Sequence, residues 1–465
     1  MKSVRIKKCC DHEKKEAGVI DMITDMTEGK PFGILWRFTV PMLISVMFQQ
    51  LYNIVDSVVA GKFVGVNALA AVGASYPITM IFMAVATGLN IGCSVVISLY
   101  FGAKEYEQMK SAVSTSLLTV LGISVFLTIL GLILGRPLMT LLKTPEDIFG
   151  DSALYLNIYI CGLIFLFMYN ICTGVFTALG DSKTPLYFLI ASSIGNIILD
   201  LVFVICFHMG VGGVAWATFL AQGVSSILAF FTLQKRLKSV GSREYRRFSS
   251  TMLKKIMEVA VPSILQQSFI SVGNLFVQGL INSYGSAVVA GYSAGMKINT
   301  FAITSFTTLG NGVSSFTAQN MGARKPDRIS KGFRAGTVMV LSVAVPVFLL
   351  FFFAGQPIVQ LFMSEGGERA AEVGVEFLRI TSPFYAVISL KLIADGILRG
   401  AGAMKAFMIA TFSDLILRVI LAFVLSGVWG ETGIWLSWPV GWVIGTSLSV
   451  GFYISGIWKK QNLIA

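Results

Sequence analysis

Long apolar segments recur along almost the whole chain and are separated by short polar connections. Twelve of them reach roughly twenty residues or more, the length that an α-helix needs to cross a hydrocarbon core of about 30 Å. They span residues 34–60, 69–98, 111–134, 152–178, 185–207, 210–233, 256–282, 287–318, 335–354, 372–398, 405–427 and 432–457. The pattern predicts an all-α integral membrane protein with twelve transmembrane helices.

The second six segments repeat the first six at an offset of 220 residues. The offset superposes GLNIGCSVVISLYFGAK (88–104) on TLGNGVSSFTAQNMGAR (308–324), and with one residue of slack Pro41 meets Pro262. Because each copy has an even number of spans, both copies enter the membrane from the same side. We therefore predict two parallel, pseudo-symmetric six-helix lobes around a central cleft.

Basic residues gather in alternate connections, above all in QKRLKSVGSREYRRFSSTMLKK (234–255). By the positive-inside rule these connections and both termini are cytoplasmic, which predicts a multi-pass protein of the plasma (inner) membrane. The expected parts are a cytoplasmic N-terminal tail (1–32), a first lobe (33–233), a cytoplasmic inter-lobe loop (234–255), a second lobe (256–458) and a cytoplasmic C-terminal tail (459–465).

Composition narrows the class of protein further. The chain has 465 residues, of which 55% are hydrophobic and 13% charged, against about 25% charged in soluble domains. The net charge is +12, but nearly all the basic residues lie in a few short segments between the apolar runs, so we expect the lipid bilayer and not a nucleic acid as its partner. No GxxxxGK[ST] motif and no catalytic constellation is present, which argues against an enzyme and for energy from an ion gradient or a separate subunit.

A few carboxylates lie inside the apolar spans of the first half. Asp56 is in the first span, and Asn196 and Asp200 stand four residues apart on one face of the fifth. A carboxylate at the centre of a membrane helix costs about 3 kcal/mol on insertion scales, so its presence calls for a use. Tyr155 and Thr218 add hydroxyl groups in the same half. These residues predict a coupling site for a hard cation such as Na⁺ or for a proton.

The second half lacks these acids. The repeat places Val277 where Asp56 stands. Two pairs, Lys391 with Asp395 and Asp414 with Arg418, are instead each spaced four residues apart on one helix. This spacing allows the charges within a pair to neutralise each other, and we interpret both pairs as structural.

Pro41 and Pro262 fall at matching depths in the first helix of each half. Each removes a backbone hydrogen bond and can kink its helix, which suggests a gating role. The polar residues that follow are our candidates for the substrate cleft: Gln49, Gln50, Asn53, Gln266, Gln267 and Asn274.

The chain resembles the multidrug and toxic compound extrusion (MATE) family, and within it the prokaryotic DinF-like branch. The resemblance rests on the following motifs in order: VPMLISVMFQQLYNIVDSVVAG, GLNIGCSVVISLYFGAK, TALGDSKTP, NIILD, VGGVAWATFLAQ, AVPSILQQSF and ILRGAG. It implies a two-lobe fold and a first-lobe cation site at the positions of Asp56, Asn196 and Asp200, with Tyr155 and Thr218 associated. Other branches of the family carry additional acids in spans seven and ten of the second lobe. Here span seven has no acid after Pro262, and Asp395 does not lie at the usual depth relative to ILRG. This difference from those branches favours coupling in the first lobe.

The expected function is therefore that of a secondary antiporter. It would export amphipathic or cationic organic compounds in exchange for H⁺ or Na⁺, as a monomer that needs no cofactor and no metal beyond the possible Na⁺. A flippase for lipid-linked precursors, as found in the same superfamily, and a gated channel are the alternatives. Reconstituted transport under separate sodium and proton gradients would distinguish them.

Overall fold

The computed structural model describes residues 24–59, 63–240, 244–362 and 367–461, without the side chains of residues 54, 56–58, 66, 67 and 69. In this part of the chain every regular element is a helix. The chain divides into two compact units. Unit one contains residues 1–28 and 40–261, and unit two contains residues 29–39 and 262–465.

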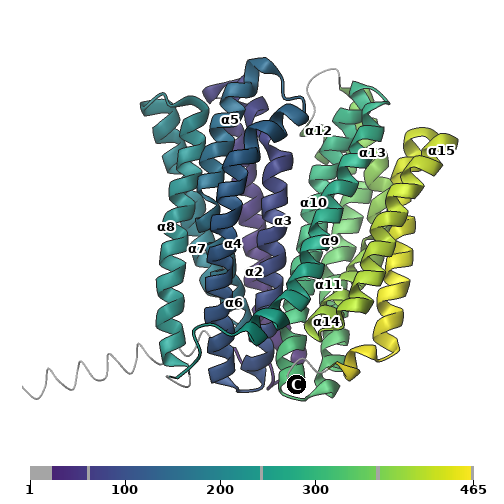
Figure 1. The fold of residues 1–465 in the computed structure, drawn as a ribbon. Helices are drawn as coiled ribbons and strands as arrows, with labels where there is room; N and C mark the ends of the chain where they lie inside the picture. The colour runs from purple at the N-terminus through teal and green to yellow at the C-terminus, as the bar shows by residue number, and fades with distance from the viewer. Residues whose placement is uncertain (1–23, 60–62, 241–243, 363–366, 462–465) are drawn as a thin grey trace, which may run out of the picture. The chain divides into compact units, whose positions relative to one another are not determined.

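The first half of the chain forms the helices at the purple-to-teal end of Figure 1. They are α2 (Pro31–Val59), α3 (Val66–Gly102), α4 (Tyr106–Leu141), α5 (Glu146–Cys161), α6 (Leu163–Ala178), α7 (Lys183–Leu201), the π-helix η2 (Val202–Cys206) and α8 (Gly210–Ser239). α5 and α6 meet at Gly162 with a bend of 47° and together make one span.

The second half forms the helices α9 (Ser250–Asn282), α10 (Ser286–Gly322), α11 (Pro326–Phe353), α12 (Gly355–Gln360), α13 (Glu368–Thr381), α14 (Tyr385–Gly400) and α15 (Met404–Ile454), with short 3₁₀ turns η3 (Ser382–Phe384) and η4 (Ile457–Lys460). α13, η3 and α14 follow one another and complete a single span. α15 is interrupted at Gly430, whose φ of 59° breaks the helix into two spans.

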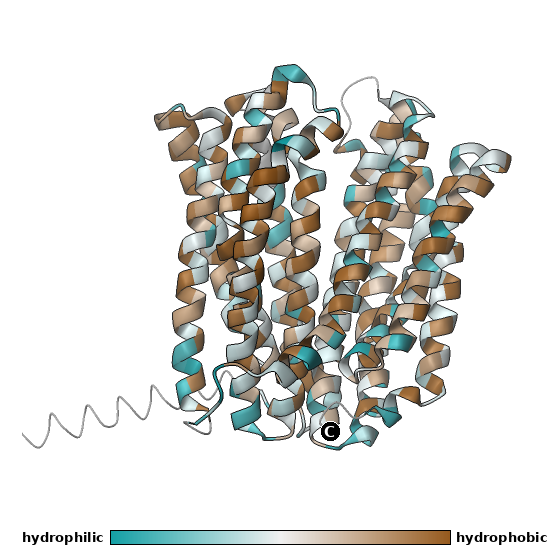
Figure 2. Ribbon diagram, viewed as in Figure 1, coloured by the Kyte–Doolittle hydropathy of each residue, from teal (hydrophilic) through white to brown (hydrophobic). Residues whose placement is uncertain are grey.

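The twelve-span membrane fold predicted from the sequence is confirmed. Nine helical stretches of the described residues are long and apolar enough to cross a membrane, or ten with the bent pair α5–α6. The division of α15 at Gly430 adds one more. The 37-residue α10 is the remaining span, and its mean hydropathy falls lower because its buried face carries many Ser, Thr and Asn residues. Figure 2 shows the helices predominantly brown along their length, with teal gathered near their ends.

The internal repeat is visible in the backbone as well as in the sequence. Left-handed residues recur 220 positions apart, at Gly65 and Gly285 before α3 and α10, and at Lys104 and Arg324 after these helices. α3 and α10 have the same length of 37 residues. A left-handed residue ends or redirects a helix, so the same turns delimit the same spans in both halves. The pseudo-symmetry therefore extends to the connections.

The boundary between the two units falls at the two prolines. α2 belongs to unit two up to Thr39 and to unit one from Val40, whereas α9 belongs to unit one up to Val261 and to unit two from Pro262. Each helix thus begins within the unit formed mainly by the other half of the sequence.

A glycine in each unit provides the close contact with the incoming helix. In unit one a Cβ atom added to Gly92 of α3 would lie 2.6 Å from the Cβ atom of Ala260 in α9. In unit two a Cβ atom added to Gly312 of α10 would collide with the side chain of Thr39 in α2. The two glycines are related by the repeat, and only glycine allows the helices to approach this closely.

The TALGDSKTP motif forms a buried polar link in unit one. The carboxylate of Asp181 accepts hydrogen bonds from the backbone N–H of Thr184 (3.0 Å) and from its hydroxyl (2.6 Å), at the start of α7. It also pairs with the guanidinium of Arg236 near the end of α8 at 3.0 Å. All three side chains are buried. The motif therefore anchors the beginning of α7 to the end of α8.

We expect Asp181→Ala to lower the free energy of unfolding by about 3 kcal/mol, because the buried Arg236 loses its carboxylate partner. Adding Arg236→Met should restore part of this stability. Denaturation of the purified protein in detergent measures both effects. Asp147→Ala, which removes an exposed carboxylate from the first turn of α5, is the control and should leave stability unchanged. A melting curve of Asp181→Ala equal to that of the wild type would contradict the assignment.

Candidate functional site

Asn196 and Asp200 lie one turn apart on the face of α7 that packs inside unit one. Their exposed fractions are 2% and 0%. We orient the Asn196 amide so that its nitrogen donates to Oδ2 of Asp200 at 2.8 Å and its oxygen accepts from the backbone N–H of Thr218 at 3.1 Å. The reverse orientation would place the amide oxygen against the carboxylate. In the orientation adopted here, the hydroxyl oxygen of Thr218 lies 3.4 Å from the amide oxygen of Asn196.

The backbone changes its winding immediately after Asp200. α7 ends at Leu201 and continues as the π-helix η2, where the N–H of Phe207 donates to the carbonyl of Val202 at 3.1 Å. π-Helical turns are rare and occur frequently at functional sites, because they widen the helix and redirect nearby side chains. The hydropathy pattern predicts an ordinary transmembrane helix over residues 185–207, and the apolar run LVFVIC carries no residue signal that distinguishes the two windings.

Thr218 also connects this cluster to Tyr155. Both residues line a small cavity of about 40 Å³ bounded by α5, α6 and α8. The ring of Tyr155 stacks on that of Tyr159, with centroids 6.4 Å apart. Most of the cavity lining is apolar, and Tyr155 and Thr218 are among its few polar residues. The structure thus brings four of the five sequence-predicted residues into one connected region: Tyr155, Asn196, Asp200 and Thr218.

Asp56 belongs to α2, but its side chain lies outside the described residues. Its membership of the cluster therefore stays a prediction. The position that the repeat relates to it, Val277 in α9, is buried and apolar. The position in the second half that corresponds to Asp56 therefore accepts a hydrophobic residue.

The candidate cleft residues lie on α2 and α9 after the prolines. Gln49 and Asn53 are exposed, and the Asn53 amide donates to Oε1 of Gln50 at 3.3 Å. Their counterparts Gln266, Gln267 and Asn274 are half-buried on α9. Contact of these side chains with a substrate remains a prediction.

A second buried charge cluster occupies unit two. The Lys391 ammonium lies 2.6 Å from Oδ2 of Asp395, as the spacing predicts, and 3.9 Å from Oδ2 of Asp414 on α15. The hydroxyl of Ser449 donates to Oδ1 of Asp395 at 2.5 Å. Arg418 does not serve as the partner of Asp414 that we expected from their spacing. Its guanidinium lies over the ring of Trp438, 4.4 Å from the centroid.

Two glycines of α15 make room for this cluster. A Cβ atom on Gly445 would lie 2.7 Å from Cε of Lys391, and one on Gly441 would lie 2.8 Å from Oδ1 of Asp414. The break at Gly430 folds the second part of α15 back, so that Gly441 and Gly445 approach residues of α14 and of the first part of α15. Sequence spacing within single helices could not reveal this contact, because it forms between separate helices.

The fold and the buried polar clusters define the class of protein. Two parallel copies of a six-helix unit, with ionisable groups deep in the spans, are typical of secondary transporters. The family model described as MatE matches residues 41–202 and 262–424, once in each half and starting at each proline. The chain belongs to the MatE family, and it is a multi-pass membrane transporter and not an enzyme.

Similar proteins are named as drug transporters. The "Probable multidrug resistance protein YpnP" of Bacillus subtilis is 28% identical, over 94% of this chain and 98% of that protein. The "Multidrug export protein MepA" of Staphylococcus saprophyticus is 23% identical, over 86% of this chain and 88% of that protein. A crystal structure of MATE in complex with MaL6 has a TM-score of 0.88 at 24% identity, covering 94% of this chain and 99% of that chain. That likeness shows the same fold.

Lys391→Met should lower the free energy of unfolding by about 4 kcal/mol, because two buried carboxylates lose the ammonium between them. Thermal denaturation in detergent measures this loss, and adding Asp395→Asn should recover part of it. Lys405→Met, on an exposed lysine at the start of α15, is the matched control. Equal losses for the two lysine variants would mean that the cluster does not hold unit two together.

Proposed function

We propose that this chain is a secondary antiporter that exports amphipathic or cationic organic compounds in exchange for H⁺ or Na⁺. It acts in the plasma membrane as a monomer, with both termini in the cytoplasm and without a cofactor. The observation that carries the proposal is the buried pair of Asp200 and Asn196 in a membrane span. The multidrug export named for YpnP and MepA supports the substrate class.

The chemistry of the cluster suits either coupling ion. Asp200 supplies a carboxylate, Asn196 an amide and Thr218 a hydroxyl, all from neighbouring positions on α7 and α8. Oxygen atoms of these groups are the ligands that hard cations such as Na⁺ take. A proton would neutralise the same carboxylate, which burial in a low-dielectric interior favours. Loading by either ion offsets the charge of the Asp200 carboxylate, and that change distinguishes the two states of a transport cycle.

The two prolines link this change to motion. Before the prolines each incoming helix contributes fully buried side chains, Leu35 and Phe38 in unit two and Ile256 and Val259 in unit one. After the prolines both helices expose large apolar residues, such as Leu51 at 59%. Pro41 removes one backbone hydrogen bond of α2, so the buried start of the helix is fixed while the later part, with Asp56, can bend. Binding of the ion to Asp56 and Asp200 would then select one bend of α2.

The asymmetry between the halves supports coupling in the first lobe. Asp395 and Asp414 in the second half share the ammonium of Lys391, so a fixed cation already serves as their partner there. Asp200 has the neutral amide of Asn196 as a donor.

Asp200→Asn and, separately, Asp56→Asn should abolish export driven by an ion gradient while substrate binding is kept, since each removes a titratable or ion-binding carboxylate. The measurement is export of a cationic dye from proteoliposomes under a proton gradient alone or a sodium gradient alone. The gradient that drives the wild type identifies the ion.

Asp327→Asn, on an exposed carboxylate in the first turn of α11, is the control and should export at the wild-type rate. Wild-type export by Asp56→Asn or Asp200→Asn under an imposed gradient would refute the coupling role of that residue. Movement of a lipid-linked sugar and not of the dye would favour the flippase reading, and flux without any gradient dependence would favour a channel.

Pro41→Ala should slow turnover while leaving the Kd for substrate almost unchanged, because alanine restores the helical hydrogen bond and stiffens α2 at the unit boundary. Dye export and dye binding, measured on the same preparation, separate the two effects. Pro262→Ala tests the equivalent position in α9.

Pro137→Ala is the matched control, since this proline also lies inside a span but near the exposed end of α4, away from the unit boundary. Its export rate should equal that of the wild type. If all three proline variants behave alike, the gating role of Pro41 and Pro262 is wrong.

A further inference from the structure

A pocket of about 470 Å³ lies in unit one, on the side where α4 begins and α8 ends. Its volume is within the range of about 300–1,000 Å³ that small-molecule sites have. α4 and α8 both pack against α5 and α6, so the two helices face each other across the pocket. The pocket is remote from Asp200 in sequence and shares no lining residue with the candidate coupling site.

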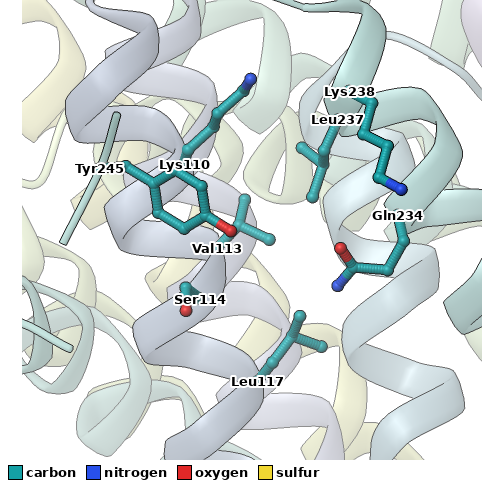
Figure 3. Close-up of a pocket in the computed structure, with 8 residues that line it drawn as sticks. All are labelled: Lys110, Val113, Ser114, Leu117, Gln234, Leu237, Lys238 and Tyr245. Carbon is teal, nitrogen blue, oxygen red and sulfur yellow. The ribbon is translucent and has the colours of Figure 1, made fainter. Parts of the chain in front are cut away.

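The lining combines two lysines with apolar and polar uncharged residues. Lys110, one turn into α4, and Lys238, in the last turn of α8, supply two ammonium groups. Of the eight described residues that line the pocket, none is acidic. Val113, Leu117 and Leu237 supply the apolar part of the lining. Figure 3 shows the α4 residues on one side and Gln234, Leu237 and Lys238 on the other, with the pocket between them.

The connection after α8 closes one side of the pocket. The hydroxyl of Ser114 donates to the carbonyl of Arg247 at 2.7 Å, and the backbone N–H of Ser249 donates to Oγ1 of Thr115 at 3.1 Å. These two bonds hold the connection against α4. They place Tyr245 at the pocket, where Figure 3 shows its ring beside α4 and its hydroxyl near Val113 and Ser114. The site is therefore built from three segments and is not a gap between two helices.

The same helix faces continue into an exposed apolar surface. Lys110, Leu117 and Leu121 follow one another along one face of α4, and Leu121 is 41% exposed. On α8, Phe231 and Ile227 lie one and two turns from Gln234 on its face, with exposed fractions of 65% and 48%. In a membrane span, exposed apolar side chains of this kind contact acyl chains.

We propose that this pocket binds the headgroup of an anionic phospholipid from the surrounding bilayer. The phosphate lies between Lys110 and Lys238, where Ser114, Gln234 and Tyr245 supply hydrogen-bond donors. The acyl chains leave past Leu117 and cover Leu121 and Phe231. Basic pockets between transmembrane helices at the cytoplasmic surface recognise anionic headgroups in this way. The lipid bridges α4, α8 and the connection that joins the two halves of the chain.

The test compares phosphatidylglycerol with phosphatidylcholine as probes. Each lipid is titrated into the delipidated, detergent-solubilised full-length protein, and the lipid-bound fraction is measured by native mass spectrometry. Phosphatidylglycerol should bind more tightly. Lys238→Gln should weaken its binding about fivefold, and the double variant with Lys110→Gln about 25-fold, because each lysine near the membrane surface contributes a similar electrostatic attraction.

Lys235→Gln is the matched control, since Lys235 is exposed on α8 but does not line the pocket. Its lipid binding should equal that of the wild type.

Lys238 is exposed, so its variant keeps the test decisive even if substitution of the buried Lys110 prevents folding. Equal binding of the two lipids, or unchanged binding in Lys238→Gln, would overturn the proposal. Binding of glycerol 3-phosphate as tight as that of phosphatidylglycerol would do so too, because a soluble anion would then be the ligand.

Discussion

The cost of placing a charge in an interior that offers no water governs this structure. Each buried ionisable group must find a partner within the protein, and the chain meets this demand in different ways. Asp181 is paired with Arg236 and receives the hydroxyl and backbone N–H groups of Thr184. Asp395 has the ammonium of Lys391 and the hydroxyl of Ser449. Asp200 has the amide of Asn196. The first two arrangements neutralise the carboxylate with a fixed cation, and the third uses a neutral donor.

Small residues and prolines mark where the helices are packed tightly and where they are not. Gly441 and Gly445 allow α15 to reach the Lys391 cluster, so this part of unit two is held by both packing and charge. Gly92 and Gly312 hold the starts of α9 and α2 in the same close manner. Beyond Pro41 and Pro262, in contrast, α2 and α9 lose this tight contact and expose large apolar side chains. The unit boundary coincides with the change from the closely packed start of each helix to its exposed apolar continuation.

Features that depend on the membrane or on local spacing could be predicted from the sequence. Hydropathy predicted the spans, the offset of 220 residues predicted the two lobes, and the four-residue spacing of Lys391 and Asp395 predicted their ion pair. Features that depend on contacts between helices could not. The cation–π contact of Arg418 with Trp438 replaced the predicted pair with Asp414, because the break at Gly430 brings a later helix alongside. The π-helical turn after Asp200 arises in an apolar run whose composition suits either winding.

The repeat also separates residues that the fold requires from residues that it does not. The left-handed turns at Gly65 and Gly285, the close contacts of Gly92 and Gly312, and the prolines at the unit boundary occur in both halves, so they serve the common architecture. Asp56 and Asp200 have no acidic counterpart, and the buried Val277 demonstrates that an apolar side chain fits at the first of these positions. A carboxylate that the fold does not need, and that the membrane makes unfavourable, calls for a functional explanation, which the proposed ion coupling supplies. The difference between the halves is therefore the strongest argument that the acids of the first lobe are functional.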